Sequence, residues 1–197
     1  MITILFGPPG SGKGTQAAVI SKRFSLPHVS TGQMLRQEVA AASDLGREVA
    51  PVMKSGGLIP DDTMVRVIEH RLVQPDAKLG VLLDGFPRTV PQAVELDAML
   101  ERTGREIPLV LFFDVPETEL SKRIAHRAEV DHRADDTPEA FIQRMREYEA
   151  KTAPVLDYYR SRGTRLEHVD GNASIDAVTD AIVPYFVAQF PPKGEVA

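Results

Sequence analysis

A glycine-rich segment near the start of the chain has the composition of a phosphate-binding loop. Residues 7–15 read GPPGSGKGT, follow a short apolar run and precede a stretch of helical character. Glycines here let successive backbone N–H groups curl around phosphate oxygens, and the start of a helix adds partial positive charge. In the G-x-x-x-x-G-K pattern the lysine, here Lys13, reaches the β- and γ-phosphates. The alternative is a tight Gly/Pro turn that carries an exposed lysine.

Two oxygen-bearing side chains could lie near a magnesium ion at such a loop. The usual pattern has Ser or Thr directly after the lysine, but this chain has Gly14 there and Thr15 one place later. Asp84 closes another apolar run, at the edge of a parallel sheet where α/β sites form. We therefore expect Mg²⁺ to bind through the nucleotide, with Thr15 and Asp84 nearby. A turn cap into Gly85 is the alternative for Asp84.

Arginines beside the motifs supply the cationic groups that phosphate chemistry needs. Because the net charge is −5, local guanidinium groups rather than the overall field must hold an anion. Planar guanidinium groups bind phosphate through paired hydrogen bonds. Arg123 and Arg127 are four residues apart on one predicted helix face, although Glu119 could instead form a surface ion pair with Arg123. The candidates are Arg36, Arg88, Arg123, Arg127, Arg133 and Arg144.

The elements that must position these residues alternate between short apolar runs and helical stretches. Uniformly apolar runs indicate strands buried on both faces, which is typical of a parallel sheet. The predicted strands are residues 2–6, 27–29, 79–84, 109–115 and 165–169. Helices are predicted over 13–24, after Asp61, after Thr137-Pro138 and from Ser174 to about 187, with Pro154 kinking or dividing the third. The fold class is therefore α/β, a doubly wound five-stranded parallel sheet.

Length and composition favour one globular domain and exclude several functions. The chain has 197 residues, 43% of them hydrophobic and 26% charged, with no cysteine. The acidic balance argues against a nucleic-acid or membrane-surface binder, and no apolar stretch approaches the ~20 residues of a bilayer span. We expect no signal peptide and a cytoplasmic location, since the absence of disulfides fits a reducing compartment.

Five stretches, in order, resemble the motifs of the nucleoside monophosphate kinases and, among these, the short-lid adenylate kinases. They are GPPGSGKGTQ, STGQMLR at 30–36, GGLIPDD at 56–62, DGFPRTVPQA at 84–93, and the paired arginines after LFFDVPE. The resemblance implies a P-loop NTPase fold and reversible phosphoryl transfer from ATP to AMP, giving two ADP, in a monomer. A hydrolytic P-loop switch would often carry an N/T-K-x-D tetrapeptide, which does not occur here.

The resemblance also implies a role for each matching residue. ATP is expected to contact Gly10, Ser11, Gly12, Lys13, Gly14, Thr15, Arg123, Arg127 and Ala173. AMP is expected to contact Thr31, Arg36, Gly57, Leu58, Ile59, Gly85, Phe86, Pro87, Arg88, Gln92, Arg133 and Arg144. The catalytic groups would be Lys13, Arg88, Arg123, Arg133 and Arg144.

The acceptor nucleotide is indicated by two of these residues. In similar adenylate kinases the positions of Thr31 and Gln92 face adenine, and an amide can read a base edge through two hydrogen bonds. The similar UMP/CMP kinases usually carry alanine at the first position and asparagine after DGFPR, where this chain has Thr89. The sequence therefore favours AMP, with a UMP/CMP kinase as the alternative.

The resemblance divides the chain into a core, an arm and a lid. The core would be residues 1–29, 60–125 and 137–187, the AMP-binding arm 30–59, the short lid 126–136 and a frayed tail 188–197. His126, Asp131 and His132 are too few for a zinc site, so no zinc is expected. Asp135 and Asp136 either favour the N-terminus of the next helix or orient nearby arginines.

Overall fold

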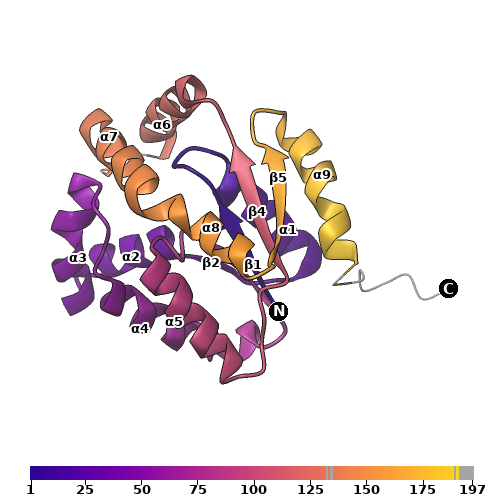
Figure 1. The fold of residues 1–197 in the computed structure, drawn as a ribbon. Coiled ribbons are helices and arrows are strands. Elements are labelled where there is room, and N and C mark those ends of the chain that lie inside the picture. Colours follow the sequence, from indigo (N-terminus) through magenta and orange to yellow (C-terminus); the bar gives the residue numbers. More distant parts are fainter. Residues whose placement is uncertain (132, 134, 189, 191–197) are drawn as a thin grey trace.

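Five parallel strands form the centre of the computed structural model, which describes residues 1–131, 133, 135–188 and 190 (Figure 1). The strand order is β2-β3-β1-β4-β5, so strands lie on both sides of β1 and the sheet is doubly wound as predicted. The strands are β1 Ile2–Phe6, β2 His28–Ser30, β3 Val81–Asp84, β4 Leu109–Asp114 and β5 Arg165–Asp170. All four neighbouring pairs are parallel.

The predicted strands differ from the observed ones only at their ends. β3 begins at Val81 rather than at residue 79, because Leu79 is 81% exposed and lies outside the buried run. β2 is shifted by one residue, since Pro27 has no N–H to donate and contributes only its carbonyl, which accepts from Leu82 N at 2.9 Å. Apolar burial on both faces therefore identified β1, β3 and β4, while local backbone chemistry set the limits of the strands.

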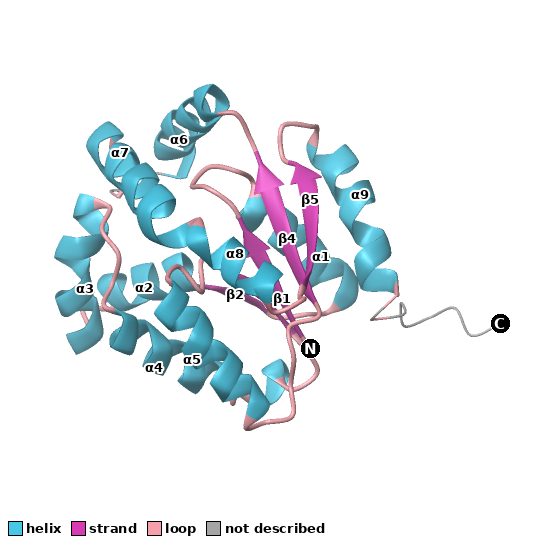
Figure 2. Cartoon of the chain, in the orientation of Figure 1, coloured by secondary structure: helices cyan, strands magenta, loops and turns pink. Residues whose placement is uncertain are grey.

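Helices cover both faces of the sheet, as Figure 2 shows in cyan around the magenta strands. They are α1 Lys13–Phe24, α2 Thr31–Ala40, α3 Asp44–Ser55, α4 Asp61–Leu72, α5 Val90–Glu101, α6 Glu117–Asp131, α7 Pro138–Glu147, α8 Pro154–Ser161 and α9 Ile175–Val187, with a 3₁₀ turn at Pro75–Ala77. The predicted caps are present: the Thr137 and Ser174 hydroxyl oxygens accept from Ala140 N and Ala177 N.

Alternate residues of each strand feed two hydrophobic layers. Ile4 packs in the layer beneath α4, α5 and α8, whereas its neighbour Leu5 packs against α1 and α9. This alternation follows from the two-residue period of a strand. Two buried layers hold the sheet rigid, so the loops at its carboxyl edge rest on a fixed base.

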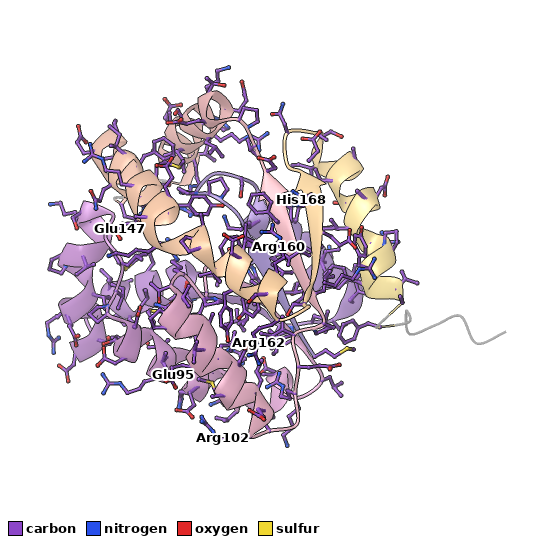
Figure 3. All side chains as sticks on the ribbon, viewed as in Figure 1. Glu95, Arg102, Glu147, Arg160, Arg162 and His168 are labelled. Carbon is purple, nitrogen blue, oxygen red and sulfur yellow. The ribbon has the colours of Figure 1, made fainter. Side chains whose placement is uncertain are left out.

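The helical segment that begins at Thr137 is divided as Pro154 predicts. α7 ends at Glu147, a π-helical turn spans Tyr148–Thr152, and Pro154 starts α8 in its first turn. α8 then packs on α5, where Asp97 Oδ2 accepts from the Tyr158 hydroxyl at 2.8 Å. Arg162, labelled in Figure 3, forms an ion pair with the same carboxylate oxygen, with Nε at 2.8 Å.

Most of the expected frayed tail, residues 188–197, lies outside the described residues. Among the helices that the structure does describe, none is long and apolar enough to cross a membrane.

Candidate nucleotide site

The loop between β1 and α1 wraps around the side chain of its own lysine. Lys13 Nζ donates to Gly7 O at 2.7 Å, to Pro8 O at 2.8 Å and to Ser11 Oγ at 3.2 Å. Gly7 has φ +146°, and a Cβ there would lie 2.6 Å from Phe113 O, so the loop can pass β4 only with glycine at this position. α1 has no acidic residue in its first turn, which leaves its positive end available to an anion.

The ammonium group of Lys13 is held in an environment that disfavours its charge. Burial lowers its pKa to about 8, Asp84 opposes this shift, and the positive charges of Arg88 and Arg127 add to it. Those effects require the phosphate loop and the two arginines to lie close together. A polyanion placed among these groups would relieve their mutual repulsion.

Asp84 lies at the carboxyl end of β3, and a histidine that the sequence analysis missed holds it there. His28 Nε2 lies 3.1 Å from Asp84 Oδ2, and both side chains are largely buried. Burial alone would raise the pKa of Asp84, but the hydrogen bond from His28 and the charges of Lys13 and Arg88 lower it. β2 and β3 are neighbours in the sheet, with His28 paired to Leu82 two residues before Asp84, and the sequence alone carried no signal of this pairing.

The residues present fit a magnesium ion. A Cβ at Gly14 would lie 3.5 Å from Asp84 Oδ2, so the carboxylate stands beside the first turn of α1. Thr15, in that same turn, is exposed. Carboxylate, hydroxyl and phosphate oxygens are the hard ligands that Mg²⁺ prefers.

A second group of predicted residues gathers around Gly85. The Thr31 hydroxyl and Arg88 Nε both donate to Gly85 O, at 2.9 and 2.8 Å. Gly85 has φ +82°, and a Cβ there would lie 2.6 Å from Thr31 Oγ1. Phe86 and Pro87, joined by a cis peptide, are buried below this point. Burial lowers the pKa of Arg88, and Asp84 partly offsets the effect.

Gln92 has both ends of its amide occupied by the protein. Its Oε1 accepts from Arg88 N at 2.8 Å, and its Nε2 donates to Asp61 Oδ1 at 2.7 Å. The other oxygen of Asp61 accepts from the Thr89 hydroxyl at 2.9 Å. Sequence reasoning treated Asp61 only as a helix start and missed these contacts.

The segment expected to pack on the AMP base follows α3. Gly56 ends that helix with φ +77°, Gly57 and Leu58 are half-buried, and Ile59 is 6% exposed within the main hydrophobic layer. A Cβ at Gly56 would lie 2.4 Å from Ala140 O, so the end of α3 touches the start of α7.

Two carboxylates bind the arginines that were predicted to hold phosphates. Arg127 donates from Nε and Nη2 to Asp136 at 2.6 and 2.8 Å, and Arg144 Nη1 donates to the same carboxylate at 2.7 Å. Arg144 Nη2 donates to Asp135 at 2.6 Å, and Arg36 lies 3.5 Å from Asp135. The side chain of Asp136 is fully buried. Of the two sequence-based alternatives for these carboxylates, orienting arginines is the one observed.

Arg133 belongs to the same region. Burial lowers the pKa of Arg36, and the charge of Arg133 contributes to that shift, so the two guanidinium groups are near one another.

Arg123 points to the loop between β5 and α9 rather than to Glu119. Its Nη1 donates to Gly171 O at 2.8 Å and its Nη2 to Asn172 Oδ1 at 3.3 Å. Glu119 accepts instead from Lys122 at 2.7 Å, so the predicted alternative of a Glu119–Arg123 pair was wrong. A Cβ at Gly171 would lie 2.9 Å from Ser11 O, which places this loop, including exposed Ala173, against the phosphate loop.

Within the described part of the chain, no three His, Asp or Glu residues are grouped so that they could hold a metal ion. The Asp131 side chain and His132 lie outside the described residues. The absence of zinc therefore stays a prediction.

Comparison with known proteins agrees with this geometry. The family model described as adenylate kinase matches residues 5–164. The adenylate kinase of Stenotrophomonas maltophilia K279a is 46% identical over 183 residues, covering 93% of this chain and 97% of that protein. The adenylate kinases of Methylobacterium nodulans and Kosmotoga olearia are 47% and 41% identical, each over 92% of this chain, covering 94% and 97% of their own lengths. The chain belongs to the adenylate kinase family, whose fold is that of the P-loop NTPases.

Proposed function

We propose that the residues at the carboxyl edge of the sheet catalyse reversible transfer of the terminal phosphoryl group of ATP to AMP, giving two ADP. This is the reaction of the family to which the chain belongs. The observation that carries the proposal is geometric: Arg88 Nε donates to Gly85 O, directly after Asp84, whose carboxylate stands beside the first turn of α1 at the phosphate loop. A lysine and several guanidinium groups around one space suit two phosphate chains that meet end to end.

On the ATP side, the loop residues Gly10 to Thr15 hold the phosphates through backbone N–H groups and Lys13. Arg123 and Arg127 bind the same phosphates from α6. The adenine lies over the loop at Ala173, which Gly171 brings against Ser11. Thr15 and Asp84 would stand beside a Mg²⁺ ion carried by the nucleotide, and that ion would supply neutralisation of the phosphate charge.

On the AMP side, Arg36 and Arg88 hold the phosphate. Thr31 and Gln92 face the base, and Gly57, Leu58 and Ile59 pack on it, above the turn at Gly85, Phe86 and Pro87. Gln92 is only 2% exposed, so a base reaches its amide only after the side chains that cover it have moved aside.

Transfer requires positioning and charge stabilisation rather than a base, because the AMP phosphate oxygen is already a nucleophile. Lys13, Arg88, Arg123, Arg133 and Arg144 stabilise the charge that spreads over the equatorial oxygens of the transferring group. Arg127 and Arg144 exchange their carboxylate partners for phosphate oxygens as the arm and the lid of residues 126–136 close and exclude water.

AMP is the favoured acceptor over UMP or CMP. The curated relatives that match the chain are consistently named adenylate kinase. Thr89, at the position where UMP/CMP kinases usually carry asparagine, donates its hydroxyl to Asp61. We further propose that the enzyme acts as a monomer in the cytoplasm and uses no zinc, as expected from the family and from the cysteine-free sequence.

Replacing Arg88 with alanine tests the proposal. ADP formation from magnesium-ATP is measured with AMP, UMP or CMP as the acceptor. We expect AMP to be preferred and Arg88→Ala to lower kcat by about 10²–10³-fold, the usual cost of one positioned cationic donor. Arg102→Ala is the matched control, since Arg102 lies at the far end of α5 and pairs with Glu69 (Figure 3). Near-wild-type turnover of AMP by Arg88→Ala would rule out the assigned role.

A further inference from the structure

Asp61 joins two residues of the acceptor site through a single carboxylate. Its Oδ1 accepts from Gln92 Nε2 and its Oδ2 accepts from the Thr89 hydroxyl. Thr89 in turn accepts from Gln92 N at 3.2 Å as the cap of α5. Asp61 is the first residue of α4, so one element reaches across and holds the side chains of the next.

The two neighbours of the Gln92 amide fix which way round it lies. The backbone N–H of Arg88 can only donate, so the atom facing it must be Oε1. Both oxygens of the Asp61 carboxylate accept hydrogen bonds, Oδ2 from Thr89, so the atom facing Oδ1 is the donor Nε2. Turning the amide over would set donor against donor at one end and oxygen against oxygen at the other. The amide is therefore held in one polarity by its two neighbours.

An amide of fixed polarity discriminates between purines. After these bonds are made, Oε1 keeps one lone pair and Nε2 keeps one N–H. Adenine offers a 6-amino donor beside the N1 acceptor, which complements that remaining pair. A 6-oxopurine offers an acceptor at position 6 beside an N1–H donor, which would require the amide to be reversed.

Asp61 also reaches the protein surface outside the acceptor site, since it is only half-buried. It lines a surface groove of about 440 Å³ between α4 and α5, together with Asp62, Val65, Arg66, Pro91 and Glu95. Figure 3 labels Glu95 on the α5 side of this groove. Asp61, Thr89, Arg88 and Gln92 all lie outside residues 30–59, so the bonds among them do not depend on where the arm stands.

We infer that Asp61 is a specificity-determining positioning residue, which locks the Gln92 amide in the orientation that accepts adenine and rejects 6-oxopurine monophosphates. The inference rests on the proposed reading of the base by Gln92. A correctly placed bidentate pair of hydrogen bonds discriminates between two bases by roughly 5- to 150-fold. By fixing the Gln92 amide, Asp61 maintains this preference for adenine over a 6-oxopurine.

The experiment compares kcat/KM for AMP with kcat/KM for IMP in purified full-length variants. Asp61→Leu removes the carboxylate, and Asp61→Asn keeps its shape but can donate as well as accept. We expect the AMP/IMP ratio of kcat/KM to fall at least about fivefold in each Asp61 variant that is folded. Fivefold is the lower end of the range for a bidentate pair. A merely structural role would lower both rates together and leave the ratio unchanged. Asp62→Asn is the matched control, since Asp62 is exposed and lies 3.8 Å from Arg66, and it should leave the ratio unchanged.

Gln92→Ala separates failure of the inference from failure of the proposed base reading. One outcome would refute the role of Asp61 and still support contact between Gln92 and the base. In that outcome the AMP/IMP ratio falls in Gln92→Ala but stays within twofold of wild type in both Asp61 variants. An unchanged ratio in Gln92→Ala as well would refute both.

Discussion

Binding of magnesium-ATP near pH 8 is expected to take up protons, because Lys13 is only partly charged in the free protein. Burial and the charges of Arg88 and Arg127 lower its pKa to about 8 despite the opposing charge of Asp84. The phosphates of bound ATP would surround the same ammonium group with negative charge and restore its pKa toward the ordinary value near 10.4. The complex then holds more protons than its separate components.

The magnitude follows from that pKa. A group with a pKa of about 8 is half protonated at pH 8, so each ATP bound takes up about 0.5 proton there, about 0.1 at pH 7 and about 0.9 at pH 9. Because the complex binds the extra proton, affinity rises as pH falls through this window, by about tenfold between pH 9 and pH 7. In the free protein the sign is opposite. The unfolded chain binds this proton more tightly, so the lysine contribution to stability increases as pH rises from about 8 toward 10.5.

Isothermal titration calorimetry measures the uptake directly. Enthalpies of magnesium-ATP binding, without AMP, are compared at pH 8 in two buffers of different ionisation enthalpy, and the slope gives the protons taken up. Lys13→Gln is the control, because the variant has no ammonium group to titrate and the arginines stay charged throughout. An uptake below about 0.1 proton at pH 8, together with an affinity that is flat from pH 7 to pH 9, would refute the placement of Lys13 as a desolvated phosphate ligand.

Two further substitutions test the supports of the site. Asp136→Asn should lower the free energy of unfolding at pH 7 by about 1.5–3 kcal/mol, because a fully buried carboxylate loses charged hydrogen bonds to Arg127 and Arg144. Because the pKa of Asp136 is lowered by its bonds to Arg127 and Arg144, this contribution is fully present above about pH 4 and decreases as pH falls through the folded-state pKa. The difference in unfolding free energy between the two proteins should therefore shrink on acidification below about pH 4, and a difference that stays constant with pH would contradict this. Gly85→Ala should lower kcat/KM for AMP by roughly 10²-fold, since the added Cβ meets the Thr31 hydroxyl at 2.6 Å, whereas Gly104→Ala, with φ +63° and open space around it, should leave AMP kinetics unchanged.

The features that followed from sequence are those governed by local periodicity and by contiguous motifs. The apolar runs located β1, β3 and β4, and the phosphate loop lies between strand and helix where its glycines required it. β2 and β5 also lie where they were predicted, although neither is a uniformly apolar run. Pro154 divided the helical segment as predicted, because loss of an N–H is a property of one residue. The π-helical turn before it had no such signature, since it depends on how α7 and α8 pack on different neighbours.

The partners of the site residues could not be predicted, because they come from chain segments far apart in sequence. Asp61 meets Gln92 across 31 residues, and His28 meets Asp84 across 56. Spacing suggested Glu119 for Arg123, yet the guanidinium group bonds 48 residues away, at Gly171. A long side chain selects among all the acceptors within its reach, and tertiary packing determines which acceptors those are.

The protein satisfies its phosphate-binding groups before any phosphate arrives. Lys13 donates to its own loop, Arg88 to Gly85 O, and Arg123 to Gly171 O. Because each nucleotide must displace hydrogen bonds of similar number, the net gain from hydrogen bonding alone is small. What changes on binding is the charge balance, since neutral carbonyls cannot offset a cluster of cations as phosphates do. Nucleotide affinity and catalysis should therefore depend more on the negative charge that the ligand brings into the cluster than on the number of hydrogen bonds it makes. For this reason the arrangement selects a fully charged phosphate chain.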